Sequence, residues 1–391
     1  MSLPQLVNIA PAPVKMCGGK ARLDKKFVEG MALHCQHWPG PVTCILRETD
    51  QPIPFGADYS VEDLPFSLRV IGPRQAIKPD DLAEADLLYA SADDSTALNL
   101  VPLARAAGAR IVYSLEYTLQ TRLQILALDN QRSLPRKLRS LVWHLQQERA
   151  RRHALRQADA IQFNGYPATS RYEGLNANRL LYLDGRMTAD LLATADDMAA
   201  RREYLRANKP LRLIHSGRLE RMKGSHDLLP LMRQLRRLGV DAVLDIYGTG
   251  SEAGAIAAGL GEFGGTVRLH DPVDFQTELT RINRQAADIF LSCHRQSDPS
   301  CSYIEAMGGG LAVAGYANRM WREMAQKSGA GPAVRLGAVT ELAGAIRELD
   351  RDREALITLC DNALAFASQH LFEDVLSRRM THLRSVLTSP A

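Results

Sequence analysis

Short apolar runs of strand type alternate with longer amphipathic stretches along this chain, and this alternation restricts its fold more than any other feature. The first half contains seven such runs, namely LVNIA (6–10), VTCIL (42–46), LRVI (68–71), DLLYA (86–90), ARIVY (109–113), DAIQF (159–163) and RLLYL (179–183). Residues 95–108 have a helical pattern that Gly108 closes, since glycine tolerates the left-handed conformation at a helix end. The alternation predicts an α/β fold in which helices cover both faces of a parallel sheet.

The same alternation begins again in the second half, after a polar stretch without strand signals. LRLIHS (211–216) has the pattern of a strand, and residues 225–238 have that of a helix, which Ser225 caps and Gly239 ends. Four further strand patterns follow, namely DAVLDIYG (241–248), TVRLHD (266–271), ADIFLSC (287–293) and LAVAGY (311–316). A chain of 391 residues also exceeds the length that one hydrophobic core usually serves.

We therefore predict two Rossmann-like, doubly wound domains that face a central cleft. The expected divisions are an N-terminal domain over 1–188, a linker over 189–209, a C-terminal domain over 210–370, and a terminal helix over 371–391 that packs back on the N-terminal domain. In open α/β sheets, ligands bind beyond the carboxyl ends of the strands. The residues that carry the chemistry should therefore lie in the turns that follow the strands.

Composition and charge exclude several classes of protein. Hydrophobic residues make up 46% and charged residues 24%, the balance of a globular protein, and the net charge is only +4. No apolar run reaches the ~18 residues that span a bilayer, and the N-terminus lacks the pattern of a secretory signal, so we expect a cytoplasmic protein. The six cysteines have no metal-ligand spacing, and we expect no metal site.

Two glycine-containing turns can bring a ligand close to the backbone. Gly18 and Gly19 follow the first strand and lead into an expected helix over 20–35, whose free N–H groups would offer a site for an anion. The alternative for this pair is a simple flexible turn. Gly248 follows the strand that ends at Tyr247, but a full GxGxxG motif is lacking there. This second position predicts a tight turn near the ligand and argues against nicotinamide binding.

A cationic loop separates the strand 211–216 from the helix 225–238. Arg218 and Lys223 lie five positions apart in Gly217–Gly224, and the loop ends at a helix N-terminus. Two cations and exposed amides form a clamp for a diphosphate, in which Arg acts as a fork and Lys as a point charge. The alternative is a solvated basic loop.

The segment 294–310, which follows the strand ADIFLSC, places an acid near the start of a short helix. Ser302 can cap that helix, and Glu305 stands at its third position. In a structural role, Glu305 only closes a capping box. In a functional role, its carboxylate accepts hydrogen bonds from sugar hydroxyls, while the amides of Ser300, Cys301 and Ser302 meet a phosphate.

These motifs in the second half resemble those of the retaining glycosyltransferases of GT-B fold, in particular the large family 4 group (glycosyl transferases group 1). GRLERMKG (217–224) matches that group's GR-L-x-x-x-K-G loop, and SYIEAMGGGLAVAGY (302–316) matches its EAM-x-x-G-x-x-V-x-G stretch. Motif order and spacing agree from about residue 5 to 370.

The resemblance implies roles for the matched residues. It implies that Arg218 and Lys223 hold the donor diphosphate and that Glu305 contacts the donor ribose. Gly18 and Gly19 match the glycine loop that sits over the donor phosphates. The substrate implied is a nucleotide-diphosphate sugar, with no further cofactor.

Two positions depart from the family pattern. The family has a first Glu eight positions before the second, where this chain has Ser297 with Asp298 beside it. Asp298, or else the backbone, takes over the contact to the transferred sugar. The family often has a His at the end of an N-domain strand, where YSLEYTL places Glu116, a candidate to orient an acceptor hydroxyl. No DxD-like pair stands at a strand end, which agrees with a metal-independent member, and Asp93-Asp94 is expected to be a helix N-cap.

Residues 131–157 form a basic segment with eight Arg or Lys and one Glu. Its large apolar residues lie on one helical face with Trp143 nearby, and they are Leu134, Leu138, Leu141, Val142 and Leu145. Basic amphipathic helices can lie on anionic membranes, which predicts peripheral contact with the inner membrane face. The alternative is a helix that faces the core with a solvated basic outer side. We expect no nucleic-acid partner, because no aromatic stacking set accompanies the charge.

The sequence thus predicts a hexosyltransferase-like enzyme that moves a sugar from a nucleotide-sugar to a glycan or lipid-linked acceptor with retention of configuration. Its pathway would be the synthesis of a cell-envelope polysaccharide. The expected catalytic residues are Arg218, Lys223, Asp298 and Glu116. One alternative is a nucleotide-sugar epimerase of the same fold. Another is a catalytically silent sugar-nucleotide-binding protein, which the missing first Glu would explain.

Overall fold

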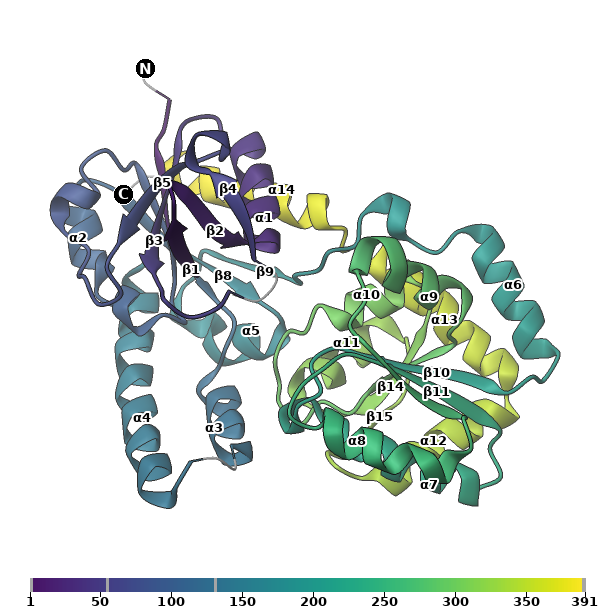
Figure 1. The fold of residues 1–391 in the computed structure, drawn as a ribbon. Helices are drawn as coiled ribbons and strands as arrows, with labels where there is room; N and C mark the ends of the chain where they lie inside the picture. The colour runs from purple at the N-terminus through teal and green to yellow at the C-terminus, as the bar shows by residue number, and fades with distance from the viewer. Residues whose placement is uncertain (1–2, 54–55, 130–131, 389–391) are drawn as a thin grey trace. The chain divides into compact units, whose positions relative to one another are not determined.

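The computed structural model describes residues 3–53, 56–129 and 132–388, which divide into two compact units (Figure 1). Unit 1 comprises Met1–Leu119, Leu138–Tyr182 and Glu373–Ala391, and unit 2 comprises Gln120–Lys137 and Leu183–Phe372. Each unit therefore combines segments that are distant in the sequence. Gln131, where the basic segment begins, and 389–391, where the expected terminal helix ends, lie outside the described residues.

Unit 1 contains a sheet in which all seven strand patterns of the first half form strands. Its strands are β1 (Leu6–Cys17), β2 (Lys20–Asp24), β3 (Val42–Glu48), β4 (Gly56–Ser60), β5 (Ser67–Ile71), β6 (Leu87–Ser91), β7 (Arg110–Leu115), β8 (Ala160–Asn164) and β9 (Arg179–Tyr182). The parallel part runs in the order β5-β3-β1-β6-β7-β8-β9. Parallel strands added on both sides of β1 are typical of a doubly wound domain.

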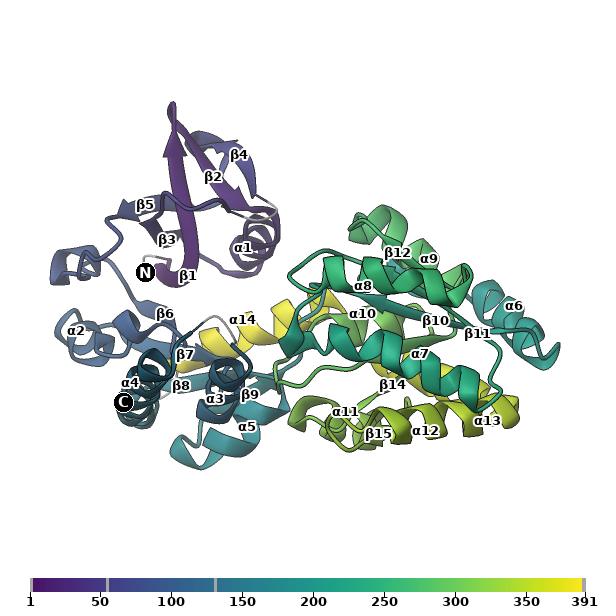
Figure 2. The same cartoon turned by 60° about the horizontal axis from the view of Figure 1, so that its bottom comes forward.

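The glycine pair of unit 1 lies in a β-hairpin, so the helix expected over 20–35 is wrong in its first part. β1 pairs antiparallel with β2, and β2 pairs antiparallel with β4. Gly18 and Gly19 have φ angles of 55° and 80°, as in a type I′ turn, whose twist suits a hairpin. Helix α1 (Lys25–His37) starts only after Asp24, whose side chain caps it. Figure 2 shows β1, β2 and β4 extending together away from strands β6–β9.

Helices pack on both faces of the sheet of unit 1. They are α1, α2 (Leu100–Ala106), α5 (Tyr166–Tyr172), the second half of α4 (Leu134–Gln157) and α14 (Phe372–Thr388). Leu6 and Val7 are consecutive in β1 and belong to two different hydrophobic clusters, as side-chain alternation along a strand requires. The cluster around Leu6 also contains Met380 of α14. Helix α14 therefore contributes to the same hydrophobic core as strand β1.

Unit 2 contains a parallel sheet in the order β12-β11-β10-β13-β14-β15, which is the strand order of a Rossmann fold. Its strands are β10 (Leu211–Ser216), β11 (Ala242–Tyr247), β12 (Val267–His270), β13 (Ile289–Ser292), β14 (Ala312–Tyr316) and β15 (Ala333–Val334). All five strand patterns of the second half are therefore confirmed. The two residues of β15 carried no strand signal of their own.

The stretch 189–209, expected to be a linker, contains helix α6 (Ala195–Arg206), which is part of unit 2. Arg201 of α6 is buried, and its guanidinium donates to the carbonyl oxygens of Asn283, Gly309 and Gly310 at 2.7, 3.0 and 2.9 Å. Its fixed fork of donors thus satisfies carbonyls that α9 (Thr280–Gln285) and α10 (Ser302–Gly308) leave unpaired at their ends. The other helices of this unit are α3 (Leu119–Leu128, from Gln120), α7 (Leu228–Arg237), α8 (Ala253–Gly259), α11 (Arg319–Ser328), α12 (Val339–Arg351) and α13 (Arg353–Ala367).

Helix α7 begins later than the sequence indicates. Residues 225–227 form a separate turn, and α7 has no side-chain cap, so the expected role of Ser225 is wrong. The apolar face is confirmed, because Leu228, Leu231 and Leu235 are buried. Within the described ranges, no helix is both long enough and apolar enough to cross a bilayer.

Candidate functional site

Glycines hold three loops of unit 2 together where strands β10, β11 and β13 end. A Cβ at Gly248 would collide with the carbonyl oxygen of Gly217, and a Cβ at Gly224 with that of Cys293. Both glycines have positive φ angles, 148° and 70°. The three loops therefore pack backbone against backbone, which only glycine permits at these points. The tight turn expected at Gly248 is present, and it braces the cationic loop.

Lys223 and Asp298 form a buried ion pair at this meeting of loops. Lys223 Nζ donates to Asp298 Oδ2 at 2.5 Å, and the two residues are only 8% and 6% exposed. The second carboxylate oxygen, Asp298 Oδ1, is buried and accepts no hydrogen bond from any described residue. A buried acceptor without a partner destabilises a protein by roughly 1–3 kcal/mol. Oδ1 is therefore suited to accept a hydrogen bond from a bound hydroxyl.

Arg218 lies in the same loop but is exposed to solvent. Lys223, by contrast, is fixed against Asp298. Of the two cations of the expected diphosphate clamp, Lys223 is therefore held in place and Arg218 is solvated, and the clamp itself stays a prediction.

Ser297 stands where the family pattern has its first Glu, and it serves the structure of the loop. Its N–H donates to Gln124 Oε1 at 3.1 Å, its carbonyl oxygen accepts from Thr121 Oγ1 at 3.3 Å, and its Oγ accepts from the N–H of Arg319 at 3.1 Å. Gln124 and Thr121 come from α3. These bonds fix the backbone next to Asp298, so Ser297 is a positioning residue.

Three further polar side chains are buried on β10 and in the loop after β13. His215, His294 and Gln296 are each at most 2% exposed, and each has a side-chain atom without a hydrogen-bond partner among the described residues. Burial, and to a smaller extent the charge of Lys223, lower the pKa of His215 to about 4 and that of His294 well below its usual value. Both imidazoles are therefore neutral at pH 7. They add hydrogen-bonding groups near Lys223 without adding charge.

Glu305 lies near the start of α10, but it does not close a capping box. Its carboxylate accepts a hydrogen bond from Arg186 Nε at 2.8 Å, and α10 has no side-chain cap at Cys301, the residue before it. The guanidinium of Arg186 in turn lies over the ring of Phe275, 4.2 Å from its centroid. The capping alternative is therefore wrong. Glu305 remains the candidate for the donor ribose, now with a cation beside it.

Ser300, Cys301 and Ser302 form the turn that leads into α10. Ser300 Oγ and Ser302 Oγ are hydrogen-bonded at 2.7 Å, and Cys301 Sγ donates to Asp184 Oδ2 at 3.9 Å. Ser302 is the first residue of the helix, not its cap. The proposed contact between this turn and a phosphate stays a prediction.

Glu116 lies in unit 1, directly after β7. Its Oε2 accepts a hydrogen bond from Asn164 Nδ2 at 3.2 Å. The carboxylate of Asp93 accepts the backbone N–H groups of Glu116 and Tyr117 at 2.7 and 3.0 Å, so Asp93 positions this loop instead of capping a helix. Asp94 does cap the short turn that follows it, as expected for the acidic pair.

Arg186 and Phe275 are the site residues that sequence reasoning missed. Arg186 lies 119 positions before Glu305, so no local spacing connects the two. The sequence shows only that Arg186 is a basic residue just before the expected linker, and its pairing with Glu305 becomes evident only in the fold.

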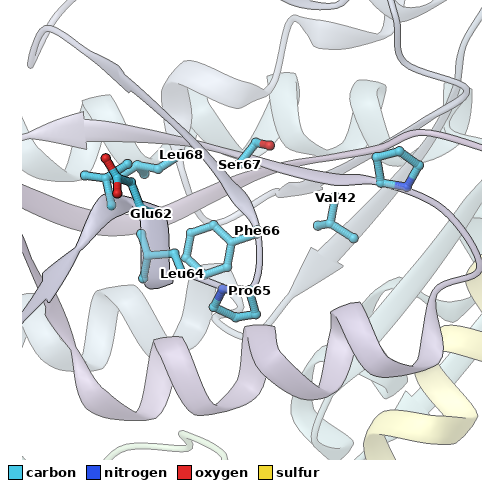
Figure 3. Close-up of a pocket in the computed structure, with 9 residues that line it drawn as sticks. Val42, Glu62, Leu64, Pro65, Phe66, Ser67 and Leu68 are labelled. Carbon is cyan, nitrogen blue, oxygen red and sulfur yellow. The ribbon is translucent and has the colours of Figure 1, made fainter.

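Unit 1 also contains a cavity of about 530 Å³ (Figure 3). Prolines and apolar side chains such as Leu64 and Phe66 make up most of its lining, and Glu62 is the charged residue among them. None of the predicted site residues lines this cavity. It therefore takes no part in the candidate site.

Comparison with known proteins gives a family match over part of the chain. Residues 196–363 match the model of the family described as glycosyl transferases group 1. The matched stretch contains Lys223, Asp298 and Glu305. No curated protein matches the chain.

Solved glycosyltransferases share the fold over almost the whole chain. HepE from Anabaena, in complex with UDP, has 16% sequence identity and a TM-score of 0.67, and the match covers 97% of this chain and 99% of HepE. Sucrose-phosphate synthase from Thermosynechococcus elongatus has 16% identity and a TM-score of 0.68, with coverages of 98% and 99%. A glycosyltransferase from Rickettsia africae has 9% identity and a TM-score of 0.65, with both chains covered in full.

The likeness to these structures establishes the two-domain GT-B fold that the motifs predicted. The family match lies within the unit that contains the cationic loop, the buried ion pair and the Glu305 carboxylate. The chain thus combines a match to glycosyl transferases group 1 over residues 196–363 with a GT-B scaffold, and it is a glycosyltransferase.

Proposed function

We propose that the enzyme transfers a sugar from a nucleotide-diphosphate sugar to a glycan or lipid-linked acceptor, with retention of configuration and without a metal ion. The pathway would be the synthesis of a cell-envelope polysaccharide in the cytoplasm. The observation that carries the proposal is the buried Lys223–Asp298 pair, whose Oδ1 accepts no hydrogen bond from any described residue. HepE has been solved in complex with UDP-glucose, which supports UDP-sugars as the first donors to test.

Lys223 and Arg218 are proposed to stabilise the negative charge on the leaving diphosphate. Lys223 is already held at the ends of the strands, whereas Arg218 is free to close over the phosphates. A preformed cation at the site of developing charge contributes roughly 2–4 kcal/mol to catalysis. In this proposal the two side chains supply the positive charge that a metal ion supplies in other enzymes.

Asp298 Oδ1 is proposed to accept a hydrogen bond from a hydroxyl of the transferred sugar, while Oδ2 stays hydrogen-bonded to Lys223. One carboxylate would then connect the sugar to the cation that holds the diphosphate. The turn at 300–302 and Gly248 would complete the donor site beside them. The Glu305 carboxylate would accept a hydrogen bond from a ribose hydroxyl, and Arg186 would keep that carboxylate in a single orientation.

Glu116 is proposed to orient the acceptor hydroxyl. Its carboxylate is positioned by Asn164 and its backbone by Asp93, so it has the fixed geometry that such a role requires. Gly18 and Gly19, at the tip of an exposed hairpin, are proposed to approach the donor phosphates.

A panel of radiolabelled nucleotide-sugars tests this function. A transferase slowly hydrolyses its donor to free sugar, an epimerase interconverts two nucleotide-sugars, and a silent binding protein does neither. For the correct donor, Arg218→Ala and Lys223→Ala should each lower turnover by about 10²–10³-fold, and chelation by EDTA should not. Retention is checked from the anomeric configuration of the product by NMR. Near-wild-type turnover in both variants would refute the assigned roles.

A further inference from the structure

Helix α4 is anchored to unit 1 by its second half. Arg151 is 1% exposed; its Nε donates to the carbonyl oxygen of Ala92 at 2.9 Å, and its guanidinium bonds Glu148 at 3.1 Å. Tyr172 of α5 donates to the same Glu148 carboxylate at 2.9 Å. Since a helix rises about 1.5 Å per residue, the preceding residues of α4 extend as a rigid arm from this anchor.

The first half of α4 exposes large apolar side chains. Of the eight large hydrophobic residues that are exposed in the described part of the chain, five lie here, and they are Leu134, Leu138, Val142, Trp143 and Leu145. Leu134 is 81% exposed and Leu138 is 64% exposed, so these residues do not face a core. The core-facing alternative for this segment is therefore wrong for its apolar stripe. An exposed apolar cluster of this kind marks an interaction surface.

The apolar side chains form a stripe with cations beside it. A helix turns about 100° per residue, which places Leu134, Leu138, Val142 and Leu145 within an arc of about 80°. Arg149 falls inside the same arc one turn later, and Arg139 lies about 60° beyond its edge. Trp143 and Arg136 lie farther around the helix. Arg136, Arg139 and Arg149 are exposed and form no ion pair with any described residue. Residues 132–147 contain no Asp or Glu.

Charge decides which partner fits this stripe. A second copy of the chain would bring the arginines of both copies together with no acid on the stripe to pair with them. The stripe is also far smaller than the 20–30 residues per side of a stable interface. An anionic bilayer has neither problem, because its interior accommodates the apolar side chains and its headgroups pair with the arginines.

We propose that residues 134–149 of α4 lie on the surface of an anionic membrane. The leucine stripe is inserted among the headgroups, Arg139 and Arg149 bind lipid phosphates, and Arg136 lies within the negative potential of the same surface. The proposal goes beyond the glycosyltransferase activity and does not depend on the donor site. It predicts reversible attachment, because one short amphipathic stripe binds a bilayer weakly and several cations strengthen it additively.

The first test is co-sedimentation with phosphatidylglycerol-containing and pure phosphatidylcholine vesicles. The protein should bind the anionic vesicles at low salt and lose most of that binding at 1 M salt, where screening extends only about 3 Å. Each cation near such a surface contributes about fivefold, so the triple variant Arg136→Gln/Arg139→Gln/Arg149→Gln should bind about a hundredfold less well.

The matched control removes the same charge elsewhere, with Arg74→Gln, Arg171→Gln and Arg237→Gln combined. These three arginines are also exposed and have no ion pair in the described part of the chain. Equal losses in both triple variants would overturn the proposal, because net charge and not α4 would then drive binding.

The apolar stripe is tested separately. Leu138→Gln/Leu145→Gln should weaken binding at least tenfold at every salt concentration, whereas Leu181→Gln/Leu336→Gln, at two other exposed leucines, should not. Donor hydrolysis in solution should stay unchanged in all four variants, which shows that they fold and separates this test from that of the enzyme activity. Membrane docking would be refuted if the protein binds neither vesicle type. It would also be refuted if light scattering shows a change from dimer to monomer when the stripe is mutated.

Discussion

Replacing Asp298 by Asn should reveal how much the buried ion pair contributes to stability and how much to catalysis. The variant keeps the shape of the side chain but removes the charge that lies 2.5 Å from Lys223 Nζ. Because both partners are more than nine-tenths buried, the remaining lysine charge is poorly solvated, and such changes cost about 3–5 kcal/mol. At about 2–4 °C per kcal/mol for a unit of this size, even the lower limit lowers Tm by about 6–12 °C.

The double variant Lys223→Met/Asp298→Asn separates the two contributions. Removing both charges leaves no unpaired ion, so most of the stability should return, with Tm within a few degrees of the wild type. Turnover should not return, since the cation at the leaving diphosphate is lost, and kcat should stay about 10²-fold or more below the wild type. Thermal unfolding and donor hydrolysis measure the two effects. Recovery of both stability and kcat would show that the pair is only structural, and wild-type values of both in Asp298→Asn would contradict the reasoning from burial.

Three further predictions concern the same unit. Glu305→Gln should weaken nucleotide binding about tenfold by calorimetry. Tm should stay nearly unchanged, because the Arg186 side chain is 37% exposed and stays solvated when the carboxylate charge is lost, and because Glu305 caps no helix; lost stability with unchanged affinity would contradict this. Gly224→Ala should destabilise the protein by about 3 kcal/mol or more in urea unfolding, because the added Cβ meets a backbone oxygen, whereas Gly239→Ala, with a similar φ of 73° and open space, should cost only about 1 kcal/mol. The free energy of unfolding should fall by up to about 3 kcal/mol as the pH drops from 6.5 to about 4, because His215 binds a proton in the unfolded state but stays neutral in the folded state over this range. His215→Asn should reduce this pH dependence when unfolding is measured as a function of pH.

The sequence predicted the parallel strands well because a buried strand is a short apolar run bounded by turn residues, which is a local signal. It failed for the first part of the helix expected directly after Gly18 and Gly19, since a loop that leads into a helix and a type I′ hairpin turn can both have positive φ. Only the pairing of β1 with β2 distinguishes them. The role of Glu305 was left open for a different reason. A capping box is local, whereas its partner Arg186 is brought near by the fold alone.

The apolar face of α4 shows the same limit. Its periodicity and its charge were visible in the sequence, so a helix with a leucine stripe was predictable. Whether that stripe faced a core or solvent depended on where the anchor at Arg151 holds the helix, and this is set by contacts with Ala92 and Tyr172. Burial is a property of the assembled unit, and a pattern alone does not determine it.

The placement of α14 imposes an order on the synthesis of this protein. Met380, Leu383 and Val386 complete a hydrophobic cluster whose other members include Leu6 and Met31, so a ribosome must translate all of unit 2 before unit 1 can close its core. Domains usually fold as they emerge, the N-terminal one first. Here the nascent N-terminal unit keeps apolar surface uncovered until α14 has been synthesised, so α14 determines when the first unit becomes stable.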